Sequence, residues 1–307
     1  MKPLNLLFEY YTRVSPNRAI LELCGVTDRD VPYTNELDDD LTVIVNAWAR
    51  PEFLPLIWEA IQYQSRRPKE TWIVQNNPGT KAEVPRAFLQ RVRDGYNTVI
   101  FDSGLNHGCW FRFILAAIAC RTRFVAIYDD DTLSGRMALS GALDDMARAP
   151  GIYGGRGITF NYATEGPEFS NCTVSGWSAG TEKAQQVDFV GHLWVMETYW
   201  LRALLSQLPD LYLSSPNQSG ECGEDMYVSF IGQQNDVPTF VFGHGARTLT
   251  PRWSSLQGYK MGVHQNAMFK NDGLKNGDKY LKEFVGKGWR LLRYDSKIAA
   301  GCVQLPD

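Results

Sequence analysis

The fold of this chain is decided by Phe124-Val125-Ala126-Ile127-Tyr128-Asp129-Asp130-Asp131-Thr132. Its first five residues are apolar or aromatic without polar alternation, which predicts a strand buried on both faces, as in a parallel α/β sheet. Three carboxylates follow at the carboxyl end of that strand. Isolated carboxylates are not buried without partners, because removing a charge from water costs too much free energy. They therefore need a metal ion, basic partners or water, and a solvated acidic turn is the alternative.

The composition is that of an ordinary globular protein. The chain has 307 residues, of which 44% are hydrophobic, and a formal net charge of -3. This slightly acidic balance gives no support for a nucleic-acid-binding protein, although a nucleic acid acceptor is not excluded. No apolar run approaches the ~20 residues that span a bilayer, and the cysteines show neither a CxxC pair nor zinc spacing. We expect a reduced, cytoplasmic protein without a membrane span.

The first half of the chain repeats a strand–helix pattern. Strands are predicted at 41–46, 71–75, 98–101 and 124–128, and helices at 50–62, 85–93 and 110–121. Short connections between alternating strands and helices require a mostly parallel sheet with right-handed crossovers and helices on both faces. The chain has neither GxGxxG after the first strand nor GxxxxGK[ST] anywhere. The Rossmann dehydrogenase and P-loop classes therefore lose their main evidence.

The pattern changes after Asp131. A helix at 136–148 and a glycine-rich strand at 151–157 are followed by residues 161–186, whose Gly, Ser, Thr, Asn and Glu content predicts an irregular loop. Residues 187–196 have the pattern of a strand pair or of one bulged strand, and residues 198–208 that of a helix. An acidic pair then opens an apolar helix that runs to residue 231, and residues 238–243 form a last strand.

The order of these motifs is similar to that of GT-A-type glycosyltransferases. Asn46-Ala47-Trp48-Ala49-Arg50-Pro51-Glu52 resembles their first βα turn, and Asp129-Asp130-Asp131-Thr132 resembles their DxD motif. The DDDT run, the glycine-rich strand, Val190-Gly191 and Gly223-Glu224-Asp225-Met226 are most similar to the exostosin-like domain (family 64). Family 2 is the looser match. The resemblance covers about residues 41–245.

This resemblance implies an α/β protein with the GT-A fold and hexosyltransferase-type activity. Such an enzyme moves a sugar from a nucleotide-diphosphate donor, above all a UDP-sugar, to a glycan or other hydroxyl acceptor. The DDDT run implies retention of configuration, with an inverting family-2-like enzyme as the alternative. Mn²⁺ or Mg²⁺ is implied too, because a hard cation held by carboxylates neutralises the leaving diphosphate.

Two alternatives of other classes stay open. A nucleotide-sugar-binding module without catalysis would bind donor without turnover. A metal-dependent nucleotidyltransferase shares the acidic strand end, but Asn46-Ala47-Trp48-Ala49-Arg50 is a poor version of its glycine- and basic-rich loop.

The resemblance also divides the chain. Residues 1–40 are expected to form a helical or irregular arm. Residues 41–250 form the catalytic domain, with a nucleotide-sugar half at 41–135 and an acceptor half at 136–250. Residues 251–307 form a tail that folds back over the donor site.

The expected metal ligands are Asp131 and then Asp129, with His264 completing the metal or diphosphate site and His244 competing for that role. Asp225, and after it Glu224, is expected to carry the chemistry, by deprotonating an acceptor hydroxyl or by stabilising an oxocarbenium-like transition state. A helix cap is the alternative interpretation of Asp225.

Donor binding is expected from polar side chains at strand ends and from arginines. Asp130 is assigned to the ribose hydroxyls, Asp102 to a nucleobase imide and Arg112 to the diphosphate. Asx turns are the alternative for the strand-end residues, and a solvated helix position is the alternative for Arg112. The full set is Asn46, Arg50, Asn76, Asp102, Arg112, Asp130 and Arg252.

Overall fold

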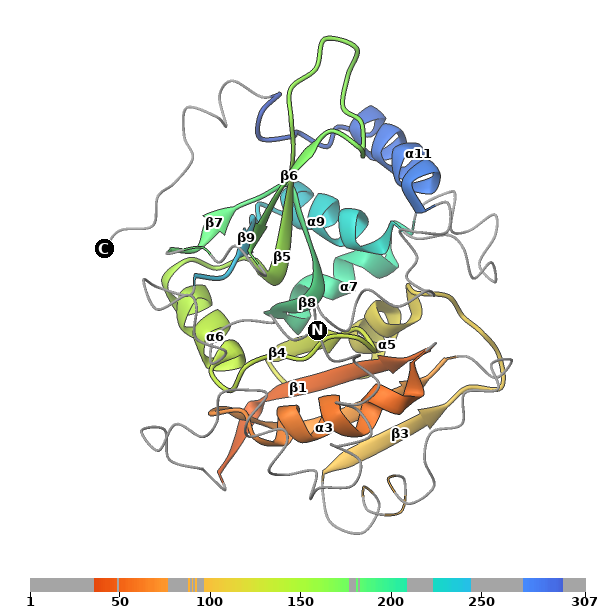
Figure 1. The fold of residues 1–307 in the computed structure, drawn as a ribbon, viewed down its shortest axis with the longest axis vertical. Coiled ribbons are helices and arrows are strands. Elements are labelled where there is room, and N and C mark those ends of the chain that lie inside the picture. Colours follow the sequence, from red (N-terminus) through yellow and green to blue (C-terminus); the bar gives the residue numbers. More distant parts are fainter. Residues whose placement is uncertain are drawn as a thin grey trace, which may run out of the picture.

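The computed structural model describes residues 36–48, 50–76, 97–176, 183–208, 223–243 and 273–294, with residues 88, 90, 92 and 181 between them. Several predictions lie outside these ranges: nearly all of the amino-terminal arm, most of the helix at 85–93, and the side chains of His244, Arg252 and His264. The described residues form one nine-stranded sheet with helices around it (Figure 1).

The described part of the first half contains the four predicted strands, with helices between β1 and β2 and between β3 and β4. Strand β1 begins at Leu37, so residues 37–40, which were predicted to belong to the helical or irregular arm, are part of the sheet. Strand β1 is followed by a short 3-10 helix, η1, and then by α3, β2, β3, α5 and β4. Their bounds are β1 Leu37–Ala47, η1 Pro51–Phe53, α3 Leu54–Gln62, β2 Arg67–Gln75, β3 Thr98–Asp102, α5 Phe111–Ala119 and β4 Phe124–Tyr128.

Within its described residues, the second half contains five strands and four helices. The bounds are α6 Ala138–Arg148, β5 Ile152–Phe160, β6 Cys172–Gly176, β7 Gln185–Gln186, β8 Phe189–Glu197, α7 Thr198–Leu205, α9 Glu224–Gln234, β9 Thr239–Val241 and α11 Gly273–Gly286. Helix α11 lies in the carboxyl-terminal region, where the sequence pattern predicted no helix.

The sheet has the order β3-β2-β1-β4-β8-β5-β9-β7, with β6 paired to β5. Strands β1 to β4 are parallel, which confirms the prediction for that half. Strand β8 then enters antiparallel between β4 and β5. Strand β9 runs parallel to β5. Strand β6 pairs antiparallel with β5, and β7 pairs antiparallel with β9. The sheet is therefore parallel around β1 and mixed beyond β4.

The strand order reverses at β1, which has β2 on one side and β4 on the other. In open α/β sheets, ligands bind outside the carboxyl ends of strands at such a switch point. Val45 lies opposite Tyr128 in the parallel register. Asn46 and Asp129, the residues that follow them, therefore lie next to each other at the carboxyl ends of adjacent strands, at one edge of the sheet.

Helices cover both faces of the sheet. One face packs against α5, α7, α9 and α11 through residues such as Ile44 and Ile127. The other face packs against α3 and α6 through residues such as Val43 and Tyr128. Residues Val125 to Tyr128 have no exposed surface, so the prediction of a strand buried on both faces is confirmed for β4.

The predicted irregular loop at 161–186 was wrong in part, because it contains β6 and β7. Strand β6 pairs with β5 only, and Val174 in its middle is 45% exposed. Thr173 and Val174 are consecutive and both exposed, so β6 lacks the apolar alternation of a half-buried strand and its sequence looks like that of a loop. In the next segment the bulged-strand alternative holds: β8 is one strand whose register shifts opposite Gly154 and Arg156.

The segment from α11 to Tyr294 is attached to the sheet by buried polar contacts. The Asp188 carboxylate accepts hydrogen bonds from the Phe160 amide at 2.7 Å and the Leu292 amide at 2.8 Å. The Tyr294 hydroxyl donates to the Asn161 carbonyl and accepts from the Ala163 amide. This region therefore packs as part of the same body as β5.

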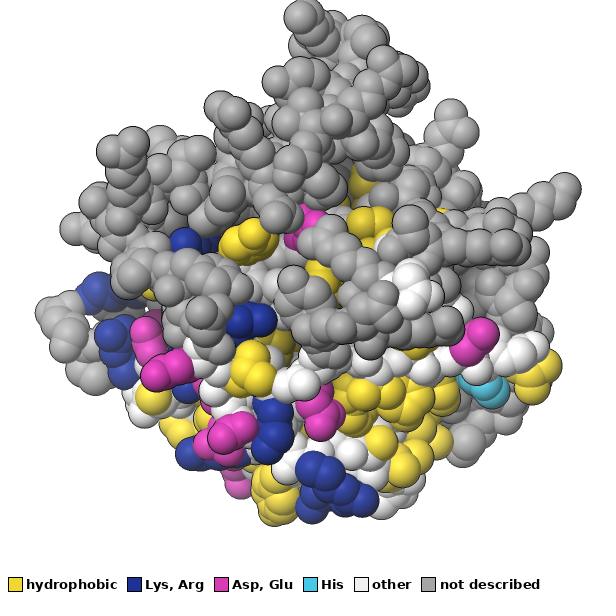
Figure 2. All heavy atoms as spheres, turned by 90° about the horizontal axis from the view of Figure 1, so that it is seen from below, with side chains coloured by type: hydrophobic (Ala, Val, Ile, Leu, Met, Phe, Trp, Pro, Cys, Tyr) yellow, Lys and Arg dark blue, Asp and Glu magenta, His cyan; other side chains and the backbone are white. Residues whose placement is uncertain are grey.

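The described helices include none that is both long and apolar enough to cross a membrane. On the face shown in Figure 2, the coloured Lys and Arg side chains lie among Asp and Glu side chains. Elsewhere in the described structure, the ion pairs Arg66–Asp38 and Lys69–Asp39 likewise join basic side chains at or just before β2 to acidic side chains of β1. The coloured part of that face thus offers no continuous basic surface of the kind that binds nucleic acid.

Candidate functional site

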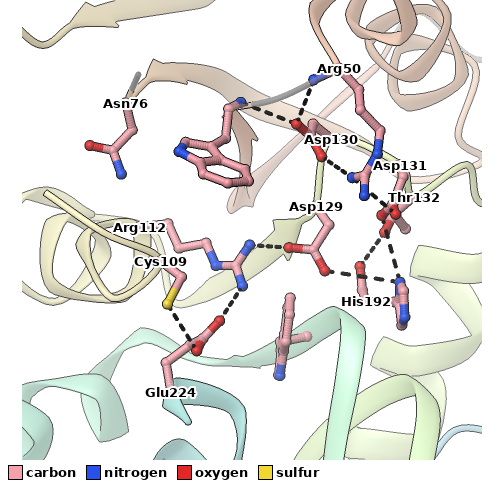
Figure 3. Close-up of polar contacts among 12 residues, drawn as sticks. Arg50, Asn76, Cys109, Arg112, Asp129, Asp130, Asp131, Thr132, His192 and Glu224 are labelled. Atoms are coloured by element: carbon pink, nitrogen blue, oxygen red, sulfur yellow. Dashed lines mark hydrogen bonds and ion pairs between the residues drawn. The ribbon is translucent and has the colours of Figure 1, made fainter. Parts of the chain in front are cut away.

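The three aspartates after β4 point in different directions, and no two of them have the same set of partners (Figure 3). Asp130 is turned back toward the connection that follows β1. Its carboxylate accepts hydrogen bonds from the amides of Trp48 and Arg50, at 3.2 and 3.0 Å, and from Arg50 Nη1 at 2.5 Å. The residue that was assigned to the ribose is therefore buried, and both of its carboxylate oxygens contact its own chain.

Asp129 and Asp131 share a different arrangement. Each carboxylate gives one oxygen to an arginine: Asp131 Oδ2 lies 3.1 Å from Arg50 Nη1, and Asp129 Oδ1 pairs with Arg112 Nη1. Each turns its other oxygen toward His192, whose Nδ1 is 3.7 Å from Asp131 Oδ1 and 4.0 Å from Asp129 Oδ2. One ligand atom from each of the three residues lies within 4.8 Å of the others.

This donor set fits a divalent cation. Carboxylates suit Mg²⁺ and Mn²⁺, and an imidazole beside them favours a transition metal such as Mn²⁺. The arrangement also keeps one ligand ionised. Burial alone would raise the pKa of Asp131, but the nearby His192 and Arg50 hold that pKa below its usual value. For Asp129, burial raises the pKa despite the opposing charge of Arg112.

His192 reaches the aspartates because of the bulge in β8. It has a positive φ of 68°, an uncommon conformation for a residue other than glycine. Its carbonyl accepts a hydrogen bond from Thr132 Oγ1 at 2.5 Å, which ties the bulge to the acidic run. Sequence reasoning did not include His192 among the candidate ligands, because only the antiparallel pairing of β4 with β8 brings it to this edge.

Arg112 joins the acidic run to the second acidic pair. It is 3% exposed and lies with its guanidinium 4.7 Å from the centre of the Trp194 ring. Its Nη1 donates to Asp129, and its Nη2 donates to Glu224 Oε1 at 2.8 Å. Burial alone would lower the pKa of Arg112, but these two carboxylates raise it. Figure 3 shows Arg112 between Asp129 and Glu224. The alternative of a solvated helix residue is therefore excluded, because the side chain is buried between two carboxylates.

The two acids at the start of α9 are not equivalent. Glu224 is buried, and its Oε2 accepts from the Gly223 amide at 3.0 Å and from Cys109 Sγ at 3.1 Å. Asp225 is half-buried and receives one hydrogen bond on its carboxylate within the described structure, from the Met226 amide at 3.2 Å. Burial, together with the charges of Glu224 and Asp129, raises the pKa of Asp225 to about 7.

Arg156 on β5 is a second residue that sequence reasoning missed. Burial lowers its pKa, and the charge of Asp225 opposes that shift. The guanidinium therefore lies within electrostatic reach of Asp225. Its signal in the sequence was weak, because a single arginine in a glycine-rich strand is not distinguished by spacing.

The remaining strand-end residues differ in their surroundings. Asn76 is fully buried and holds the loop before α5, donating to the Gly108 carbonyl at 2.6 Å and accepting from the His107 amide at 2.9 Å. Asn46 is buried, and its Oδ1 has no hydrogen-bond partner among the described residues. Asp102 is exposed at the end of β3.

No protein-family model and no curated protein matches the chain. Among solved structures, S. aureus TarS 1-349 in complex with UDP-GlcNAc has 13% sequence identity and a TM-score of 0.47, over 67% of this chain and 56% of that one. A second structure, of S. aureus TarS 1-349, has 14% identity and a TM-score of 0.49, over 87% and 75%. This chain thus spans little more than half of the first TarS chain. At TM-scores below 0.5 the likeness assigns neither a family nor an activity.

Proposed function

We propose that this chain is a metal-dependent glycosyltransferase of the GT-A type, which transfers a sugar from a nucleotide-diphosphate donor, in our proposal a UDP-sugar, to a hydroxyl group of a glycan or other acceptor. One observation carries the proposal. Asp129, Asp131 and His192 converge at the switch point of the sheet, and Arg112 connects them to the carboxylate pair at the start of α9. A charged leaving group and an acceptor hydroxyl need these two kinds of site side by side.

On the donor side, Asp129, Asp131 and His192 would hold Mn²⁺ or Mg²⁺. When bound, the cation would neutralise the negative charge that develops on the leaving diphosphate. Arg50 pairs with Asp131 Oδ2 and Arg112 pairs with Asp129 Oδ1. These pairs keep the second oxygen of each carboxylate turned toward His192. Asp130 holds the connection after β1 in place, which makes it a residue of the scaffold in this proposal.

On the acceptor side, Asp225 is the base in our proposal. A general base works best when its pKa is close to the working pH, and the pKa of Asp225 is about 7. Glu224 accepts hydrogen bonds from Arg112, Gly223 and Cys109, so its two oxygens are engaged. Asp225 would take the proton from the acceptor hydroxyl, while Glu224 keeps the start of α9 in position.

A base of this kind favours inversion of configuration. The DDDT run implies retention, but Asp225 is suited to deprotonate the acceptor that attacks the anomeric carbon directly. We therefore propose the inverting alternative. NMR of the anomeric proton in the first product distinguishes the two, because inversion and retention yield opposite anomers from one donor.

The experiment that tests the proposal is a panel of nucleotide sugars with and without Mn²⁺, scored by thermal shift and by donor hydrolysis. We expect at least one donor to bind and turn over only with the metal, and Asp131→Asn to lose both effects. Asp144→Asn, which changes an exposed carboxylate on α6, is the control and should behave like the wild type. The proposal fails if no donor depends on the metal or if Asp131→Asn is unchanged. Binding without turnover that Asp225→Ala leaves unaltered would instead identify a non-catalytic binding module.

A further inference from the structure

Gly223, the residue before the acidic pair, is in direct contact with an aromatic ring from the end of the chain. Its φ is 139°, a conformation open to glycine and rarely to other residues. A Cβ atom at this position would lie 2.5 Å from two ring carbons of Tyr280 on α11. The glycine backbone therefore rests on the Tyr280 ring, without room for a side chain between them.

The conformation of Gly223 sets the geometry of both acids. Its amide donates to Glu224 Oε2 at 3.0 Å, and its carbonyl accepts from the Tyr227 amide at 2.9 Å. These two hydrogen bonds fix the first turn of α9, which carries Glu224 and Asp225. A rotation of the Gly223 peptide would therefore move the carboxylates relative to Arg112 and the metal ligands.

The Tyr280 ring also packs near Trp110, in the segment that carries Cys109 and Arg112. Tyr280 is 2% exposed, and its ring centre lies 6.2 Å from that of Trp110, which in turn lies 5.3 Å from that of Tyr227. Trp110 stands between Cys109 and the first residue of α5, two positions before Arg112. Tyr280 thus packs against both segments that donate hydrogen bonds to Glu224: residues 109–112, through Cys109 and Arg112, and Gly223, through its amide.

We propose that Tyr280 is a positioning residue of the active site. It supports Gly223 in its positive-φ conformation and thereby fixes the directions of the Glu224 and Asp225 carboxylates. Protein interiors are close-packed and contain few voids. A smaller side chain at position 280 therefore leaves space in which the Gly223 peptide can rotate. The effect on turnover rests on the proposed transferase function, whereas the effect on the start of α9 does not.

The test compares Tyr280→Leu with Tyr280→Phe and with Phe169→Leu. A Cβ atom at Gly277 on the same helix would lie 2.8 Å from two ring carbons of Phe169. The Phe169 ring packs against Phe160 and Phe189, so its truncation removes an aromatic contact of α11 away from Gly223. We expect Tyr280→Leu to lower kcat by roughly tenfold to a hundredfold, as small misplacements of catalytic groups do, with a donor KM close to that of the wild type. Tyr280→Phe keeps the ring and should restore kcat. Phe169→Leu should leave kcat within about twofold.

Hydrogen exchange of backbone amides, measured by mass spectrometry, provides a readout that needs no activity. Tyr280→Leu should accelerate exchange in the peptide that covers residues 224–230, whereas Phe169→Leu should not. Equal effects of the two leucine variants, or no effect of Tyr280→Leu on exchange, would overturn the inference. A wild-type protein that turns over no donor would overturn the proposed function, while the exchange comparison would still decide the role of Tyr280.

Discussion

Arg112→Met is the substitution whose effect follows most directly from the geometry. The methionine keeps an apolar stem that can still pack against Trp194 and Phe113, so the change removes mainly the charge. It leaves Asp129 and Glu224 without their shared partner. Removing one member of a buried ion pair typically costs about 3–5 kcal/mol, because the other charge stays buried.

Most of this loss should come from Glu224. Its side chain is 7% exposed, whereas that of Asp129 is 24% exposed and can regain water. We therefore expect Arg112→Met to lower the free energy of unfolding at pH 7 by about 3–5 kcal/mol. Adding Glu224→Gln to that variant removes the unpaired charge and should recover about 2 kcal/mol or more. Urea unfolding of the four proteins of this cycle measures both numbers.

Arg123→Met is a matched control for this prediction. Arg123 also pairs with a carboxylate, that of Glu197, at 3.0 and 2.8 Å, and lies 4.8 Å from the centre of the Phe124 ring. Its side chain, however, is 64% exposed, so the loss should be no more than about 1 kcal/mol. The reasoning is refuted if Arg112→Met and Arg123→Met cost the same, or if Glu224→Gln restores nothing.

Three further predictions concern the metal, the base and the link to α11. His192→Ala should weaken Mn²⁺ binding by roughly tenfold or more, as measured by calorimetry, whereas His107→Ala, in the loop before α5, should not. The rate of transfer should fall about tenfold per pH unit below pH 7, where Asp225 is protonated. Glu224→Gln should move this acidic limb of the pH–rate profile to lower pH, because the charge of Glu224 helps to raise the pKa of Asp225. An acidic limb near pH 4 in the wild type would contradict the assignment. Burial raises the pKa of Asp188 from 3.8 to about 6, so the folded state binds more protons between these values and stability falls as pH rises, by about 3 kcal/mol in total. Asp225, whose pKa is also raised, adds a loss over the same pH range in both proteins. The fall in the free energy of unfolding from pH 4 to pH 7, measured with urea, should therefore be smaller in Asp188→Asn than in the wild type by most of this amount.

The elements of the first half were predictable because their local pattern matches their burial. Strand β4 is apolar throughout and is buried on both faces. The edge strand β6 and the helix α11 were missed for opposite reasons. Strand β6 is polar enough to be taken for a loop, and α11 lies among residues whose composition suggested only a tail. Both are stabilised by contacts with β5 and α9, far away in the sequence.

The site was predictable in its location and less so in its membership. Carboxyl ends of parallel strands meet at one edge, so residues after β1 and β4 had to lie together. Sequence reasoning also pointed to the acidic pair at the start of α9. Which arginine would contact which acid did not follow, because Arg112 and Glu224 are separated by 112 positions. His192 and Arg156 entered only through the pairing of β8 with β4 and β5.

The sequence by itself determined that three carboxylates end a buried strand at the ligand-binding edge of an α/β sheet. Only the tertiary structure decided what each carboxylate does. Asp130 holds the β1 connection, Asp129 and Asp131 each turn one oxygen toward His192, and Glu224 is engaged by three donors. The physical reason is that the role of a carboxylate depends on which neighbours occupy its oxygens. Those neighbours come from β1, α5, β8 and α9, which no local pattern connects.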